Sequence, residues 1–203
     1  MALALLALCG ISHAQQAATA GAPSGRLGQR YVGTSYGIAD YQGLAEEFHD
    51  ASLGVNLPVT KALDVDFGYG YQWLRNNPVD VSAHSLDAGA TLYTAKRGVK
   101  PFVSASLAYV WTKYSFAGNA IKKDDEGVFG VALGLETSVG PIVLTPSVGY
   151  SDSFKDNNPA YSYGIDAHYW LTQKIGLRAA LSYSDYDGDL ESLNYRVGVR
   201  VSF

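Results

Sequence analysis

The feature that most constrains this chain is a strict alternation of apolar with small or polar residues over long segments. Between Leu63 and Trp73 the odd positions are apolar or aromatic, whereas the even positions are Asp, Gly or Gln. The last segment, from Leu193 to Phe203, alternates in the same way. A period of two is that of a β-strand with unlike surroundings on its two faces, because a helix would scatter both sets around its axis. The sequence therefore predicts an all-β fold.

The same alternation predicts about ten strands. They are expected near 30–39, 50–58, 63–73, 82–93, 101–112, 127–137, 142–152, 160–169, 175–185 and 193–203. The connections at 59–62, 94–100, 138–141 and 170–174 are mostly short, whereas those at 40–49, 113–126 and 186–192 are longer and more acidic. Short turns at one rim and long loops at the other are typical of a single transmembrane up-and-down antiparallel β-barrel.

Alternation alone does not say which face lies inside, because a soluble lipocalin-like barrel also alternates, with its apolar face inward. Three features favour an apolar face turned to lipid. The polar face consists of Gly, Ser, Thr, Asp and Arg, which suit a hydrated or ion-paired lumen. The strands have the length of a tilted membrane span, about 9–11 residues. Aromatic residues gather near the long-loop rim, at the depth that amphipathic rings prefer in a bilayer.

Two residue sets follow from this parity. An aromatic girdle is predicted from the apolar-parity rings near the long-loop rim: Tyr69, Tyr71, Trp73, Tyr109, Trp111, Tyr161, Tyr163, Tyr183 and Tyr195. A polar network, in which inward acids pair with arginines, is predicted to fill the lumen: Asp64, Asp66, Asp87, Glu136, Asp166, His168, Arg178, Arg196 and Arg200. The arginines are placed inward because a basic side chain facing lipid at mid-membrane costs roughly 2–4 kcal/mol.

The C-terminal segment ends on an aromatic residue of the apolar parity. It resembles the last strand of small Gram-negative outer-membrane β-barrel proteins of the OmpA-like, OmpX-like and opacity types. The resemblance implies location in the cell outer membrane, with outer-membrane lipid, lipopolysaccharide and, during biogenesis, the barrel-assembly machinery as partners. The assembly signal that it implies comprises Tyr195, Val197, Val199, Val201 and Phe203. Small barrels of these types have eight strands, so a barrel of eight strands is the alternative to one of ten.

The N-terminus predicts export. Met1 to Cys9 is apolar, and Ser12-His13-Ala14 has the small-x-small form that signal peptidase prefers. The expected organisation is a signal peptide at 1–14, a flexible leader at 15–28 and one outer-membrane barrel at 29–203. Cys9 is the only cysteine, so disulfides and cysteine metal sites are not expected in the exported chain.

Catalytic chemistry is not expected. His49-Asp50 and the pair His84 and Asp87 lie near the long-loop rim, but His84 has the outward parity and the loops are too short for a deep cleft. No serine stands in a recognisable nucleophile context.

Two further polar groups have structural explanations. Asp166 and His168 share an inner face and are expected to form a polar pair within the lumen. The acidic run at 185–191 lacks the full pattern of a calcium loop. We therefore expect neither a metal nor a cofactor. The net charge of -4 gives no basic footprint for nucleic acid.

Two functions remain open. The favoured one is a non-enzymatic structural or surface-interaction protein with a largely filled polar lumen and an unspecified surface partner. The alternative is a narrow porin-like channel for small solutes or ions, which inward glycines such as Gly68, Gly70 and Gly89 would widen. Side chains just fill a barrel of about eight strands, and open channels appear at about sixteen, so ten favours the closed form. An outer-membrane protease or lipid-modifying enzyme has the least support.

Overall fold

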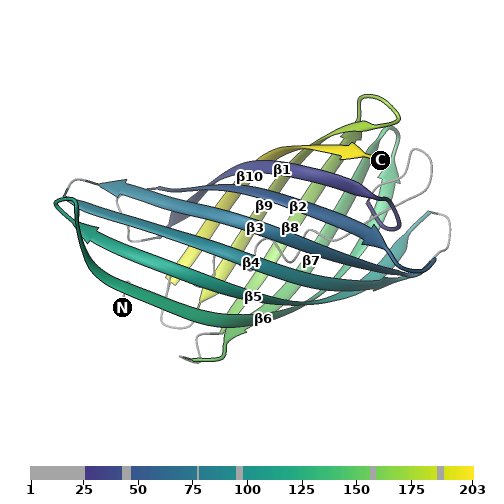
Figure 1. Ribbon diagram of the computed structural model, residues 1–203. Coiled ribbons are helices and arrows are strands. Elements are labelled where there is room, and N and C mark those ends of the chain that lie inside the picture. Colours follow the sequence, from purple (N-terminus) through teal and green to yellow (C-terminus); the bar gives the residue numbers. More distant parts are fainter. Residues whose placement is uncertain (1–25, 43–46, 77, 95–97, 156–158, 187–189) are drawn as a thin grey trace.

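The computed structural model describes residues 26–42, 47–76, 78–94, 98–155, 159–186 and 190–203. Over these residues the chain forms ten strands in one closed antiparallel barrel (Figure 1). The strands are β1 (Tyr31–Tyr41), β2 (Phe48–Pro58), β3 (Leu63–Asn76), β4 (Val79–Tyr93), β5 (Lys100–Phe116), β6 (Asn119–Val139), β7 (Ile142–Ser153), β8 (Ala160–Trp170), β9 (Ile175–Tyr186) and β10 (Leu190–Ser202). Each strand pairs with its sequence neighbours, and β1 closes the ring on β10. The predicted all-β barrel of ten strands is confirmed.

In the described part of the chain, no helix has both the length and the apolar character needed to cross a membrane.

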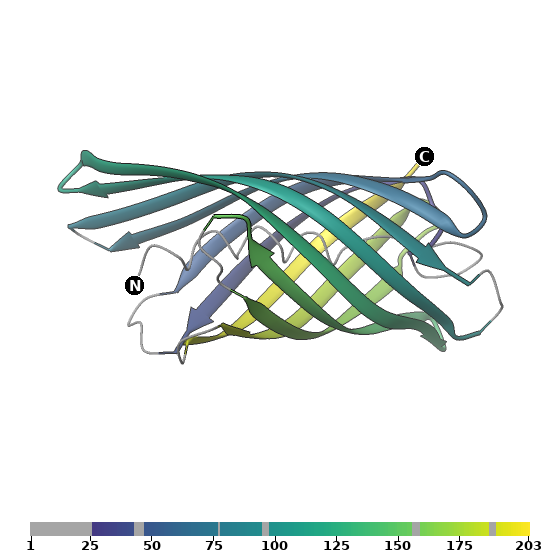
Figure 2. The same cartoon turned by 90° about the horizontal axis from the view of Figure 1, so that it is seen from below.

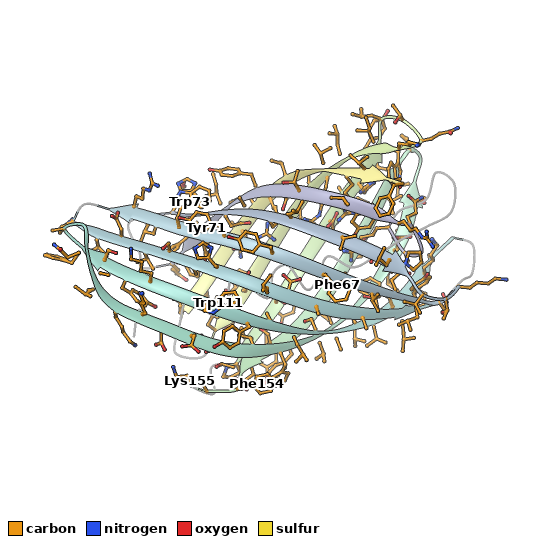
Figure 3. All side chains as sticks on the ribbon, viewed as in Figure 1. Phe67, Tyr71, Trp73, Trp111, Phe154 and Lys155 are labelled. Atoms are coloured by element: carbon orange, nitrogen blue, oxygen red, sulfur yellow. The ribbon has the colours of Figure 1, made fainter. Side chains whose placement is uncertain are left out.

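Side chains alternate between an apolar outer face and a lumen. Large apolar residues of the outer parity are exposed, among them Leu53, Phe67, Leu107 and Val197. Figure 3 shows Phe67 and the labelled aromatic side chains on the barrel wall. An exposed apolar belt of this extent is stable only against an apolar solvent such as lipid. The lumen is lined by the opposite parity, rich in glycine and serine.

We call the two ends of the barrel the terminal rim, where β1 begins and β10 ends, and the hairpin rim, opposite to it. The prediction of a long loop at 113–126 is wrong. Strands β5 and β6 continue through it and meet at Ala117-Gly118, where both residues have positive φ (48° and 80°). Such a two-residue turn matches the twist of paired strands, and the ladder satisfies the backbone of this polar run. The ends of β3 to β6 therefore extend the wall at the hairpin rim (Figures 1 and 2).

Among the described residues, the buried apolar side chains of the lumen form two clusters, one near each end. The hairpin-rim cluster consists of Ala39, Tyr41, Phe48, Val81, Ala83, Val110, Val128, Ala160 and Tyr186. The terminal-rim cluster consists of Leu27, Tyr93 and Phe102. Polar side chains occupy the stretch between these clusters, which makes the lumen the natural place to search for a site.

Candidate functional site

All nine residues of the predicted lumen network lie on the inner face, and each is at most 8% exposed. The structure divides them into two groups. Arg178, Arg196, Arg200, Asp166 and His168 lie on β8, β9 and β10. Asp64, Asp66 and Asp87 lie on β3 and β4, on the far side of the ring, and Glu136 lies on β6.

Asp166 is the centre of the basic group. Its Oδ2 lies 2.5 Å from Nε of Arg178 and 3.8 Å from Nη2 of Arg200. Arg200 also contacts Nδ1 of His168 through Nη1, at 3.0 Å. The expected pairing between Asp166 and His168 is replaced by contacts with arginines of β9 and β10. Residues two apart on one strand are separated by roughly 6.5 Å along it, so long cross-strand side chains reach them more readily.

Arg196 forms a two-point ion pair with an acid that was not predicted to belong to the network. Its Nε donates to Oδ1 of Asp50 at 3.1 Å, and its Nη2 donates to Oδ2 at 3.0 Å. Asp50 on β2 and Arg196 on β10 are both register partners of Gly37 on β1, so the side chains meet over a residue without a Cβ. A Cβ at Gly37 would lie 3.0 Å from Cγ of Asp50. The sequence pattern could have predicted this position, because Asp50 is four residues from Gly54 and therefore lies on the same, small-residue face of the strand.

The acids of β3 and β4 do not pair with arginines as predicted. Asp64 instead accepts hydrogen bonds from Asn56 Nδ2 (3.2 Å), Tyr93 Oη (3.1 Å) and the Gly28 N–H. Among the described residues, Asp66 and Asp87 form no ion pair, and one oxygen of each has no protein partner. The predicted arginine partners lie on β9 and β10, on the opposite side of the barrel. The alternation of a single strand predicts which face a side chain is on, but not how far it lies from side chains of other strands.

Glu136 pairs with a lysine. Its partner is Lys100 (3.0 Å), which is its register partner on β5, rather than an arginine.

The histidine couples considered for catalysis are divided between the two faces of the wall. His49 and His84 face outward, where Nδ1 of each hydrogen-bonds a tyrosine hydroxyl at 2.7 Å. Asp50 and Asp87 face the lumen. Residues separated by one or three positions on a strand point to opposite faces, so neither couple can act as a base and its orienting acid.

The nine predicted girdle residues lie on the outer face, each half-buried or exposed. Ring contacts join several of them, with centroids 5.3 Å apart for Tyr71 and Trp73 and 5.0 Å apart for Tyr109 and Trp111. Figure 3 shows Tyr71, Trp73 and Trp111 on the same part of the wall. Sequence reasoning missed further members of this aromatic band: Tyr36, His49, His84 and Tyr150.

The residues of the predicted assembly signal are exposed on the outer face of β10 and at the C-terminus. Their recognition by assembly factors stays a prediction.

The mouth at the terminal rim is covered by a segment that the sequence placed in the leader. Signal residues 1–14 lie outside the described part of the chain, as do leader residues 15–25. Arg26, Leu27 and Gly28 differ from a flexible leader, because Arg26 and Leu27 are each only 2% exposed. Leu27 packs with Tyr93 and Phe102, which remove its side chain from water.

Within the described residues, no group of three or more His, Cys, Asp or Glu side chains could hold a metal ion. The acidic run at 185–191 includes 187–189, which lie outside the described residues.

Comparison with known proteins gives two kinds of match. The family described as outer membrane protein beta-barrel domain matches residues 1–203. A search of curated proteins found no match. Among solved structures, the chain is similar to an outer membrane channel from Pseudomonas putida, with a TM-score of 0.56, 10% identity, and coverage of 92% of this chain and 100% of that one.

Two Neisseria proteins are similar as well. The translocator domain of the autotransporter NalP from Neisseria meningitidis has a TM-score of 0.53 and 13% identity, with 97% of this chain and 93% of that chain covered. Neisserial surface protein A has a TM-score of 0.51 and 16% identity, with 86% and 97% covered. At these identities the similarities show the fold alone.

Proposed function

Because this chain belongs to the outer membrane protein beta-barrel domain family and lies in the outer membrane, we propose that it is a non-enzymatic surface protein whose barrel is closed to solutes. The observation that carries the proposal is the occupation of the lumen at three successive levels. Apolar side chains fill both ends, and ion pairs fill the stretch between them.

The level at the hairpin rim is apolar and aromatic. Tyr41, Phe48 and Tyr186 are 1%, 4% and 8% exposed, and their rings form a contiguous group. The ring centroids of Tyr41 lie 5.2 Å from Phe48 and 6.2 Å from Tyr186. A hydrated ion passing between such rings would lose water without gaining a polar partner, which is costly.

The middle level of the lumen contains two buried ion pairs. The pair of Arg196 with Asp50 and the pair of Arg178 with Asp166 are buried, with every side chain at most 10% exposed. Both involve close, charge-assisted hydrogen bonds, which are stronger and more directional than neutral ones. Side chains fixed in this way obstruct the bore rather than line an open passage.

The surface role rests on the extension at the hairpin rim. The β5–β6 hairpin carries exposed apolar residues, Phe116 (50%) and Ile121 (67%), beside charged ones such as Lys122 and Asp124. An apolar group rimmed by charge is a typical protein-interaction surface. Strands hold it more rigidly than a loop would, which lowers the entropy cost of binding.

A narrow channel is the second candidate, favoured by the segregation of charge in the lumen. Acids on β3 and β4 face arginines on β9 and β10, an arrangement that would orient a small polar solute. The similar Pseudomonas putida structure is a channel, whereas the other two are a translocator domain and a surface protein. One fold hosts all three, so fold does not decide the function.

Conductance in planar lipid bilayers separates the two candidates. The purified full chain, shown to be folded by its altered gel mobility when unheated, should insert without producing discrete current steps. A matched variant, Tyr41→Ser with Tyr186→Ser, tests whether the rings hold the closure and should show more frequent current fluctuations. Stable, uniform steps from the unmodified protein would overturn the closed-barrel proposal in favour of the channel.

A further inference from the structure

The segment before β1 crosses the terminal-rim mouth as a bound peptide would. Side chains from three strands of the wall hold its backbone. The Arg26 N–H donates to Oε2 of Glu136 on β6, and the Gly28 N–H donates to Oδ2 of Asp64 on β3, both at 2.7 Å. Asn56 on β2 donates through Nδ2 to the Gln29 carbonyl at 2.8 Å. These contacts address the main chain, so they suit another segment whose backbone follows the same course.

Two side chains of the segment occupy defined positions. The Arg26 guanidinium lies over the Phe102 ring, with Cζ 5.7 Å from the centroid, a cation–π geometry. Leu27 packs with Phe102 and Tyr93. Gly28 has φ of 95°, a conformation that other residues rarely adopt. The mouth therefore accepts a basic residue, then an apolar one, then glycine.

The two carboxylates that hold the segment also have partners on the wall. Glu136 keeps its ion pair with Lys100, and Asp64 keeps its hydrogen bonds from Asn56 and Tyr93. If the segment withdrew, the mouth would open to water, which would hydrate the freed carboxylate oxygens. Exchange of the segment for a similar peptide would thus leave neither Glu136 nor Asp64 without a partner.

We propose that the terminal-rim mouth is a peptide-binding site, filled by the chain's own Arg26-Leu27-Gly28 and open to competing segments of the same basic–apolar–glycine chemistry. The site faces the side on which the chain terminates, opposite to the extended hairpins. The inference does not rest on the lumen being closed to solutes, because binding at the mouth is measured separately from conductance.

Fluorescence anisotropy with a labelled peptide of residues 22–29 tests the proposal on the full chain in detergent. Weakening the internal segment with Arg26→Ala and Leu27→Ser should tighten binding of the peptide about tenfold or more relative to the unmodified protein, since the site is then more often vacant. A control, Val59→Ser, changes an exposed apolar residue in the turn after β2 and should leave binding as in the unmodified protein. The proposal would be overturned if the unmodified protein, the double variant and the control bound the peptide equally. It would also be overturned if a peptide with Glu in place of Arg26 and Ser in place of Leu27 bound as tightly as the original peptide.

A second measurement keeps the barrel otherwise intact. Leu27→Cys, made together with Cys9→Ala, is buried in the mouth and should react slowly with a maleimide. Addition of the peptide should accelerate labelling severalfold by displacing the segment. A labelling rate that does not change with saturating peptide would contradict the proposal.

Discussion

Removal of the charge of Asp166 tests the ion-pair level of the lumen most directly. Asp166→Asn keeps the shape of the side chain but leaves Arg178, 8% exposed, without its carboxylate at 2.5 Å. Breaking a buried pair by removing one partner typically costs about 3–5 kcal/mol, because the remaining charge is uncompensated. The nearby Arg200 adds a second positive charge, 3.8 Å from the same carboxylate oxygen, so we expect the upper part of that range.

The assay is urea unfolding of the protein in phospholipid vesicles, followed by the fluorescence of its three tryptophans. Asp166→Asn should lower the free energy of unfolding by about 3–5 kcal/mol. The double variant Asp166→Leu with Arg178→Leu should recover most of the loss, since no buried charge is then left alone. Lys122→Ala is the exposed control, because its ion pair with Asp124 is solvated and worth about 1 kcal/mol or less. A loss below about 1 kcal/mol for Asp166→Asn, or a double variant as unstable as the single one, would refute this reasoning.

Three further outcomes are expected. Gly68→Ala should destabilise the barrel by about 1–3 kcal/mol, since the new Cβ would meet the Asp87 carboxylate at 2.5 Å. Gly54→Ala is the control and should cost less, because its Cβ would lie 3.4 Å from the nearest atom. Equal unfolding midpoints for the two variants would contradict this. Ala117→Gly should raise amide-exchange protection in the β5–β6 hairpin, because the left-handed conformation costs alanine roughly 1–2 kcal/mol; unchanged or lower protection would count against it. Deletion of Phe203 should reduce insertion in cells but not folding of the purified chain in detergent, and normal insertion would exclude a role as an assembly signal.

The ion pair of Asp50 and Arg196 shows what the sequence could predict and what it could not. Parity placed Arg196 in the lumen, and the same rule applied to β2 would have placed Asp50 there. Their pairing, however, depends on two registers at once, since the two residues are 146 positions apart in sequence and both face Gly37. No local pattern encodes that relation.

The same limit explains the outer hairpin and the mouth. Residues 113–126 are polar enough to suggest a loop, yet most of them pair across β5 and β6 and so continue as strands. Arg26 and Leu27 carry no period of their own, so only the position of Phe102 and Glu136 shows that they are bound.

The sequence by itself determined the all-β fold, the ten strands and the parity of each strand, because the pleat of a strand fixes parity locally and every second residue faces the same solvent. Only the tertiary structure decided which acids meet which arginines, that apolar rings cluster near one end and that the segment at 26–29 contacts the wall at the other. These are consequences of register and ring closure, which place residues from distant strands opposite one another and leave no trace in the period of any single strand.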